Sequence, residues 1–189
     1  MKPLILSFLV LVFLSCNDHK KESPAAENDT TAIALSPVTD TTHTATSGKI
    51  DIERFGPVKI GQPASETLKA LGEPDEKTVA TEWGADGLLH EDWTWISHGI
   101  KINLSSEKTN ISGSMAVFSI NASAPCTFKT MAGIGIGSSY EDIVAAYPRD
   151  INKEESSQEQ VTIGSVYGGI IFILQQNKVT NIFLGAAAE

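Results

Sequence analysis

The chain has 189 residues, and its 23 acidic residues outnumber its 14 lysines and arginines, giving a net charge of −9 at pH 7. This balance argues against nucleic acid as a partner, because binding to phosphates requires clustered basic side chains. It also argues against electrostatic adhesion of the chain to anionic lipid.

Residues 1–15 have the composition of an export signal. Lys2 supplies a positive charge, residues 4–14 form an apolar run with a single serine, and Ser15 is a small residue at the end. Such a run covers only about half of the hydrocarbon core of a bilayer, so it is too short for a stable span. We therefore interpret residues 1–15 as a signal peptide.

The end of this signal, Phe13-Leu14-Ser15-Cys16, resembles a lipobox, the site at which bacterial lipoproteins receive lipid on a cysteine before the signal is removed. Phe13 stands where that pattern prefers leucine. The resemblance implies lipid attachment at Cys16 and lasting anchorage, since a mature lipoprotein carries more than one acyl chain. We expect a chain held in the cell envelope, at the outer membrane, on its periplasmic or its surface side. The alternative is an ordinary signal peptide followed by an incidental cysteine.

Residues 16–49 are expected to form the lipidated N-terminus and a disordered tether. The segment is rich in threonine, alanine and serine and has no aromatic residue, so it buries too little apolar surface to offset the entropy lost on folding. Beyond it, Cys126 is the second of the two cysteines. We interpret Cys126 as a small buried apolar residue, with an intermolecular bridge as the alternative.

An internal repeat organises the chain from residue 50 onward. The segments 60–72 and 136–148 both contain an isoleucine–glycine pair and then a short helical pattern that ends at a glycine or a proline. Two further pairs of segments match, 98–102 with 168–172 and 118–122 with 182–186. We predict an α+β fold with two copies of one unit, residues 50–124 and 125–189. Each copy is a helix with a three- to four-stranded antiparallel sheet, and the helices lie on one face of the sheet.

Each predicted helix has a start signal and an apolar stripe. Pro63 suits the first turn of the first helix, where its missing N–H costs nothing, and Ser138 with Glu141 forms a capping box at the start of the second. The residues expected to face the core are Leu68 and Leu71 in the first helix and Val144 and Tyr147 in the second.

The segment around Trp93 and Trp95 is expected to form a hairpin that turns at His98-Gly99. A hairpin places Trp95 opposite Ile102 and Trp93 opposite Leu104, so that one face collects the apolar residues. In an unbroken strand, the alternative, both tryptophans would share a face with polar residues and be exposed. The hairpin sorts the residues better, and both tryptophans are therefore predicted to lie in the core.

A second hairpin is predicted at Gly168-Gly169, with Tyr167 opposite Ile170 and Ile163 opposite Leu174. Its other face is also apolar, which is not expected of a half-solvated antiparallel sheet. The residues on that face are Val166, Ile171 and Ile173. Either another part of the chain covers them or a partner does, and they are the candidate partner-binding residues.

The unit has the pattern Gly61-x-x-x-Ser65-Glu66-x-Leu68-x-x-Leu71-Gly72-x-Pro74, followed by Trp93-x-Trp95. This pattern resembles the repeat of the SmpA/OmlA outer-membrane assembly lipoproteins, and two such units in tandem resemble the beta-lactamase inhibitor protein fold. The second copy departs from the pattern with Tyr147-Pro148 in place of leucine and glycine, and no inhibitor contact residue can be matched. Over residues 51–189 the resemblance implies an antiparallel sheet with helices on one face and non-enzymatic protein binding.

No catalytic or metal-binding signature appears in the sequence. Gly133-x-Gly135-x-Gly137 lacks the third glycine of the dinucleotide fingerprint, since Ser138 stands there, and no Lys-Ser/Thr pair follows. His90-Glu91-Asp92 with His98 has the residue types of a metal site, but neighbours in a strand point to opposite faces and cannot converge. We therefore expect no enzymatic activity, no cofactor and no metal.

Two functions from different classes fit these features. The favoured hypothesis is a non-enzymatic protein-binding module, of the assembly, inhibitor or scaffold type, whose partner is another envelope protein. The alternative is a small-ligand or cell-wall-fragment binding lipoprotein with a cleft between the two repeats. An open apolar sheet would favour the first hypothesis, and an aromatic-lined pocket between the repeats would favour the second.

Replacing Cys16 by alanine tests the lipid anchor. The Cys16→Ala protein should remain an uncut precursor without labelled fatty acid, because the acyl chains are attached through that sulfur. Metabolic labelling with a radioactive fatty acid, followed by gel electrophoresis, measures both properties, and Cys126→Ala is the control that keeps its label. Continued labelling of the Cys16→Ala protein would contradict the anchor.

Overall fold

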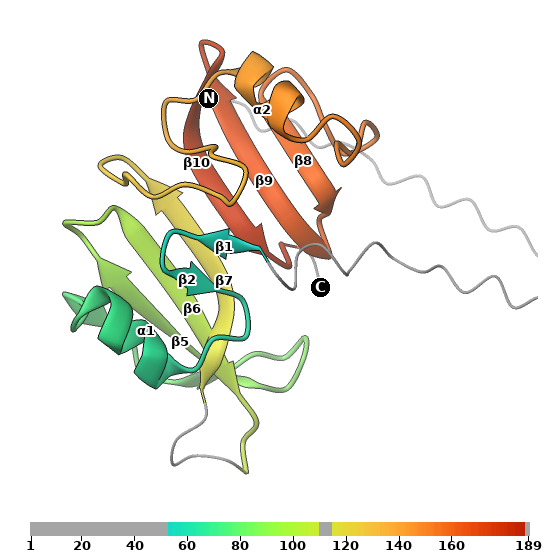
Figure 1. Cartoon of the computed structure of the whole chain (residues 1–189). Coiled ribbons are helices and arrows are strands. Elements are labelled where there is room, and N and C mark those ends of the chain that lie inside the picture. The colour runs from blue at the N-terminus through green and yellow to red at the C-terminus, as the bar shows by residue number, and fades with distance from the viewer. Residues whose placement is uncertain (1–52, 110–114, 188–189) are drawn as a thin grey trace, which may run out of the picture. The chain divides into compact units, whose positions relative to one another are not determined.

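The computed structural model describes residues 53–109 and 115–187; the signal, Cys16 and the predicted tether lie outside them. The described chain contains two helices and ten strands (Figure 1). In chain order the elements are β1 (Arg54–Phe55), β2 (Val58–Lys59), α1 (Ala64–Leu71), β3 (Glu76–Lys77), β4 (Thr81–Glu82), β5 (Leu89–Trp95), β6 (Ile100–Ser106), β7 (Ala116–Ser123), α2 (Tyr140–Ala146), β8 (Gln160–Ser165), β9 (Gly168–Gln175) and β10 (Lys178–Gly185).

Two antiparallel meanders make up most of an eight-stranded sheet. Strands β5, β6 and β7 form one meander and β8, β9 and β10 form the other. Strands β7 and β10 pair antiparallel, so the order β3-β5-β6-β7-β10-β9-β8 is continuous. Strand β4 also pairs with β5, and β1 and β2 form a separate small hairpin. The predicted combination of helices with an antiparallel sheet is therefore confirmed.

Both helices lie on the same face of the sheet (Figure 1), and the core forms between them and that face. The sheet contributes a buried side chain from every long strand, among them Trp95, Ile102, Ile120, Ile163, Phe172 and Leu184. Trp93 and Trp95 are both buried, as predicted. Cys126 is buried and not part of a disulfide, which agrees with its interpretation as a small core residue.

The first predicted hairpin is confirmed, but its register is wrong by two residues. Trp95 pairs with Ile100 and Trp93 with Ile102, rather than with Ile102 and Leu104. The chain uses a four-residue turn, residues 96–99, instead of a two-residue turn at His98-Gly99. An even shift leaves every side chain on its predicted face, so both tryptophans still point into the core.

The second hairpin turns at Val166-Tyr167, because Ser165 pairs with Gly168. The prediction of a turn at Gly168-Gly169 is wrong, and Ile163 lies opposite Ile170 instead of Leu174. The glycines are strand residues. A Cβ atom at Gly169 would collide with the backbone oxygen atoms of Ile163 and Ser165, so glycine is needed there for close strand packing rather than for turning.

The start of α2 lies one residue later than predicted. Ser139 and Asp142 form the capping box, with Asp142 N donating to Ser139 Oγ (3.2 Å) and Ser139 N donating to Asp142 Oδ2 (2.7 Å), in place of Ser138 and Glu141. The helix therefore faces the core with Ile143, which is fully buried, while Val144 is 37% exposed. The prediction that Val144 belongs to the buried stripe is wrong.

Tyr147, directly after α2, faces the core as predicted, and it attaches the helix end to the loop before it. Its hydroxyl donates a hydrogen bond to Thr130 Oγ1 (2.9 Å), and burial raises the pKa of Tyr147 to about 12. In α1, Leu68 and Leu71 pack against the core while partly exposed, and Thr67 is fully buried.

The orientation of α2 predicts that alanine substitutions at two neighbouring residues lower the free energy of unfolding by different amounts. Ile143→Ala should lower the free energy of unfolding by about 2–5 kcal/mol, because it leaves a cavity in a packed core. Val144→Ala should change it by less than about 1 kcal/mol, since the side chain is partly solvated. Urea unfolding followed by circular dichroism measures both. Equal costs would contradict this orientation of the helix.

Candidate functional site

The sheet has a second face, opposite the helices, which we call the open face. Strand pairing places one row of its side chains across six strands, in the order Thr162, Ile171, Phe183, Asn121, Lys101 and Thr94. Asn121 and Lys101 are exposed and Phe183 is partly exposed. The open face is therefore polar over the first meander and apolar over the second.

Two of the three candidate partner-binding residues, Ile171 and Ile173, lie on the open face, and the third lies in a turn. Ile171 is 8% exposed and lies between Phe183 and Thr162 in the row described above. Ile173 also lies on this face and is partly exposed. Val166 is in the turn instead of opposite Ile171, and it is partly exposed too. The sequence left open whether the chain itself or a partner covers these residues. The chain itself covers Ile171, whereas Ile173 and Val166 remain partly accessible.

Phe183 was not singled out from the sequence, although its position could have been found there. In the segment 182–186, alternation puts Ile182 and Leu184 on one face and Phe183 on the other. Because Ile182 and Leu184 fill the core, Phe183 has to lie on the open face. Together with Ile173 it supplies the apolar surface of that half.

A chain of hydrogen bonds crosses the other half of the open face. His90 Nδ1 lies 2.7 Å from Asn103 Oδ1, and His90 Nε2 lies 2.9 Å from Asp86 Oδ2. Asn103 Nδ2 donates to Asp92 Oδ1 (2.8 Å), and Lys101 Nζ pairs with Asp92 Oδ2 (2.7 Å). Since Asn103 uses its amide nitrogen for Asp92, its oxygen must accept from His90. Both ring nitrogens thus lie within hydrogen-bond distance of oxygen atoms.

Aromatic contacts hold the His90 ring in place. The Trp83 ring stacks on it at 3.7 Å between centroids, with 8° between the planes, and Phe118 meets it edge-on at 4.9 Å. The backbone N–H of Leu88, together with His90, keeps the pKa of Asp86 below its usual range. These contacts fix the loop that carries Trp83 and Asp86 against the sheet.

The polar groups of the open-face network satisfy one another. Burial by itself would raise the pKa of Asp92, but hydrogen bonds from Asn103 and Lys101 outweigh it and leave the pKa lowered. No buried side-chain nitrogen or oxygen in residues 53–109 and 115–187 lacks a hydrogen-bond partner. A fully satisfied network of this kind holds its side chains in fixed positions.

The residues considered as metal ligands do not converge. His90 and Asp92 are on the open face, whereas Glu91 points to the other side and accepts a hydrogen bond from Trp93 Nε1 (2.7 Å). His98 stacks on Phe128, 5.7 Å away. Within the described part of the chain, no three histidine, cysteine, aspartate or glutamate residues are placed to hold a metal ion.

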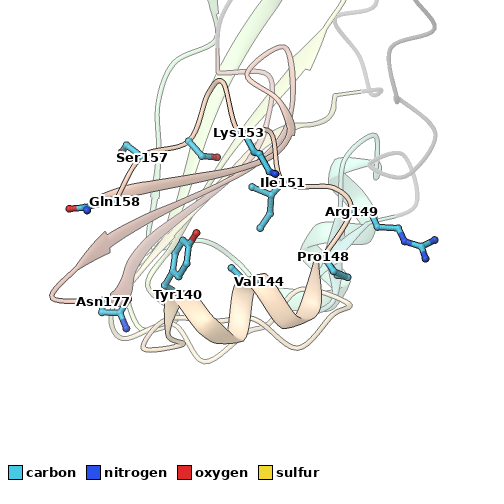
Figure 2. A pocket seen from close by; sticks show the side chains of 10 residues that line it. Tyr140, Val144, Pro148, Arg149, Ile151, Lys153, Ser157, Gln158 and Asn177 are labelled. Atoms are coloured by element: carbon cyan, nitrogen blue, oxygen red, sulfur yellow. The ribbon is translucent and has the colours of Figure 1, made fainter.

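A pocket of about 1100 Å³ lies beside α2 (Figure 2). Its lining comes from the outward side of α2, the segment that follows it and the turn before β10. The lining residues are Tyr140, Val144, Pro148, Arg149, Ile151, Lys153, Ser156, Ser157, Gln158 and Asn177. In Figure 2, Tyr140, Val144 and Ile151 point toward one hollow, while Arg149 extends away from it.

Comparison with family models, with curated proteins and with solved structures finds no match to this chain. In the ranges 53–109 and 115–187, neither helix is long and apolar enough to cross a membrane. The resemblance to the SmpA/OmlA repeat therefore stays a prediction, and the function has to be argued from the two surfaces described above.

The burial of Ile171 predicts a large effect of a charge at that position. Ile171→Lys should destabilise the domain by several kcal/mol, because an unpaired charge is forced into an apolar site. Asn181→Lys, on an exposed neighbour of the same face, should stay within about 0.5 kcal/mol of the parent protein. Thermal unfolding of both variants gives the comparison. A stable Ile171→Lys variant would mean that the side chain is uncovered in solution.

Proposed function

We propose that this protein is a bacterial lipoprotein, anchored through Cys16, that binds another envelope protein through the open face without catalysing a reaction. The observation that carries the proposal is the asymmetry of the sheet. One face is filled by helices and core side chains, whereas the other keeps Phe118, Phe183 and Ile173 partly exposed. Partly exposed apolar residues on a regular sheet are typical of a protein-binding surface.

The layout of the open face suits a protein partner better than a small molecule. Its apolar residues lie beside exposed polar ones, such as Asn121, Asn181 and Lys101. Protein interfaces likewise combine apolar residues with polar ones. The hydrogen-bond network around His90 keeps the first half rigid, so that little order has to be gained on binding.

The tandem repeat also belongs to this proposal. The segments 118–122 and 182–186, which match in sequence, run antiparallel beside each other, with Ile120 opposite Leu184. Ile120 and Leu184, which match at an offset of 64, are thus direct partners at the β7–β10 boundary, and the matching segments extend from this pair in opposite directions. That relation is expected when two copies of a helix-and-meander unit join about a local two-fold axis. It supports a doubled unit of the kind that the resemblance implies.

Small-ligand or cell-wall-fragment binding is the second candidate function. The pocket beside α2 favours it, because a hollow with an aromatic side chain and several polar groups is the usual form of a ligand site. The cleft was predicted between the two repeats, whereas this pocket is built from residues of the second predicted repeat alone. The two candidate functions therefore use different surfaces, and both can be tested in one protein.

Site-specific photocrosslinking in living cells tests the open face as a docking surface. A photoreactive residue in place of Asn121, which is exposed in the middle of the row, should give a discrete adduct with an envelope protein. The same residue in place of Ser65, exposed on α1, is the matched control and should give none. Adding Phe183→Ser to the Asn121 variant should reduce the adduct, because it removes apolar contact area.

The opposite pattern would refute the docking surface. Equal labelling from Asn121 and Ser65, or an adduct that Phe183→Ser leaves unchanged in a folded variant, would place the partner elsewhere. Circular dichroism of the Phe183→Ser variant separates a lost contact from a lost fold.

A further inference from the structure

Helix α2 has two apolar sides, and only one of them packs into the core. Ile143 and Tyr147 are buried, but Tyr140 and Val144, one turn apart, are 39% and 37% exposed. Residues four apart lie on the same side of a helix, so this second stripe is continuous. It is not part of the open face, because α2 covers the opposite side of the sheet (Figure 1). The stripe instead forms one wall of the pocket in Figure 2.

The opposite wall is the segment 151–158, which is tightly attached to strand β8. Asn152 donates from its backbone to Thr162 O (2.8 Å) and from its side chain to Gly164 O (3.0 Å). Ser156 Oγ donates to Asn152 O (2.5 Å) and accepts from Thr162 N (3.0 Å). Ser157 N donates to Gln160 O (2.7 Å). These bonds fix the wall against β8, so this side of the hollow is a preformed feature of the fold.

The two walls differ in chemistry. The helix side offers the Tyr140 ring and Val144. The segment side offers Ile151 and the hydroxyl and amide groups of Ser156, Ser157 and Gln158. None of the ten lining residues is acidic, and two are cationic: Arg149, which extends away from the hollow, and Lys153. In a chain of net charge −9, a pocket lining without a carboxylate favours an anionic ligand.

We propose that this pocket binds a saccharide that carries a carboxylate, a proposal that rests on the second candidate function and not on the open face. A sugar ring has an apolar face of C–H groups, which fits the Tyr140 ring, and a rim of hydroxyl groups, which fits the serine and amide wall. Its carboxylate would pair with Lys153, which lies beside Ile151 in Figure 2. A fatty acid chain would leave the hydroxyl and amide wall without partners, and burying those groups unpaired is costly.

Titration of the full-length protein in detergent with two matched disaccharides tests this site. The probe is N-acetylglucosaminyl-N-acetylmuramic acid, which has a carboxylate, and the control is N,N′-diacetylchitobiose, which has similar rings without it. Calorimetry should show saturable binding of the acidic sugar, at least about fivefold tighter than the neutral one. Tyr140→Ala should weaken binding about tenfold or more, and Lys153→Gln should abolish the preference for the acidic sugar. Tyr167→Ala, at an exposed tyrosine remote from the pocket lining, should bind like the parent protein.

Several outcomes would overturn the proposal. They are the absence of saturation at about 10 mM sugar, equal affinity for both disaccharides, unchanged binding in the Tyr140→Ala variant, and displacement of the sugar by laurate. Thermal unfolding identifies any variant that fails to fold, and Tyr140→Phe then provides a conservative replacement that should retain binding. Photocrosslinking from Asn121 should be unaffected by Tyr140→Ala, so failure at the pocket and failure at the open face give different results.

Discussion

The pairing of β7 with β10 is the contact on which the rest of the structure depends. It turns two three-stranded meanders into one sheet, with Ile120 opposite Leu184 and Ala122 opposite Ile182 on the core side. Gly185 permits the close approach, because a Cβ atom there would lie 2.9 Å from the backbone oxygen of Phe118. Without this pairing, each meander would present one more open edge and a much smaller core, and unpaired edges invite aggregation.

With the sheet joined, the two remaining margins are closed by local structure. On one side, residues 150–152 follow β8: Gly164 N donates to Asp150 O and Asn152 N to Thr162 O. On the other side, β5 is flanked by the short strands β3 and β4. Both margins are closed and the helices occupy one face, so the open face is the broad regular surface that the described chain leaves to solvent. Its polar and apolar halves follow from which strand residues point outward.

The alternation of strand residues was the most reliable information in the sequence. It assigned Trp93, Trp95 and Ile171 to the correct faces even where the predicted register was wrong, because both registers were wrong by an even number of residues. Turn positions were less predictable, since Gly168 and Gly169 serve close strand packing and not the turn. The cap of α2 was ambiguous, because Ser138 and Ser139 each precede an acidic residue by three positions. The pocket could not be predicted at all, because its wall is held by hydrogen bonds between the loop after α2 and strand β8.

That same loop takes part in both candidate surfaces. On the pocket side it contributes Ser156 and Ser157. On the open-face side, Thr162 Oγ1 donates to the backbone oxygen of Glu155 (3.0 Å), and Val166 N donates to Glu155 Oε2 (2.9 Å). Because Thr162 lies in the open-face row, Glu155 has to lie on that side of β8. Hydrogen bonds from one short segment therefore fix the turn that ends in Val166 and the polar wall of the pocket. Neither surface can shift far while these bonds to β8 remain intact.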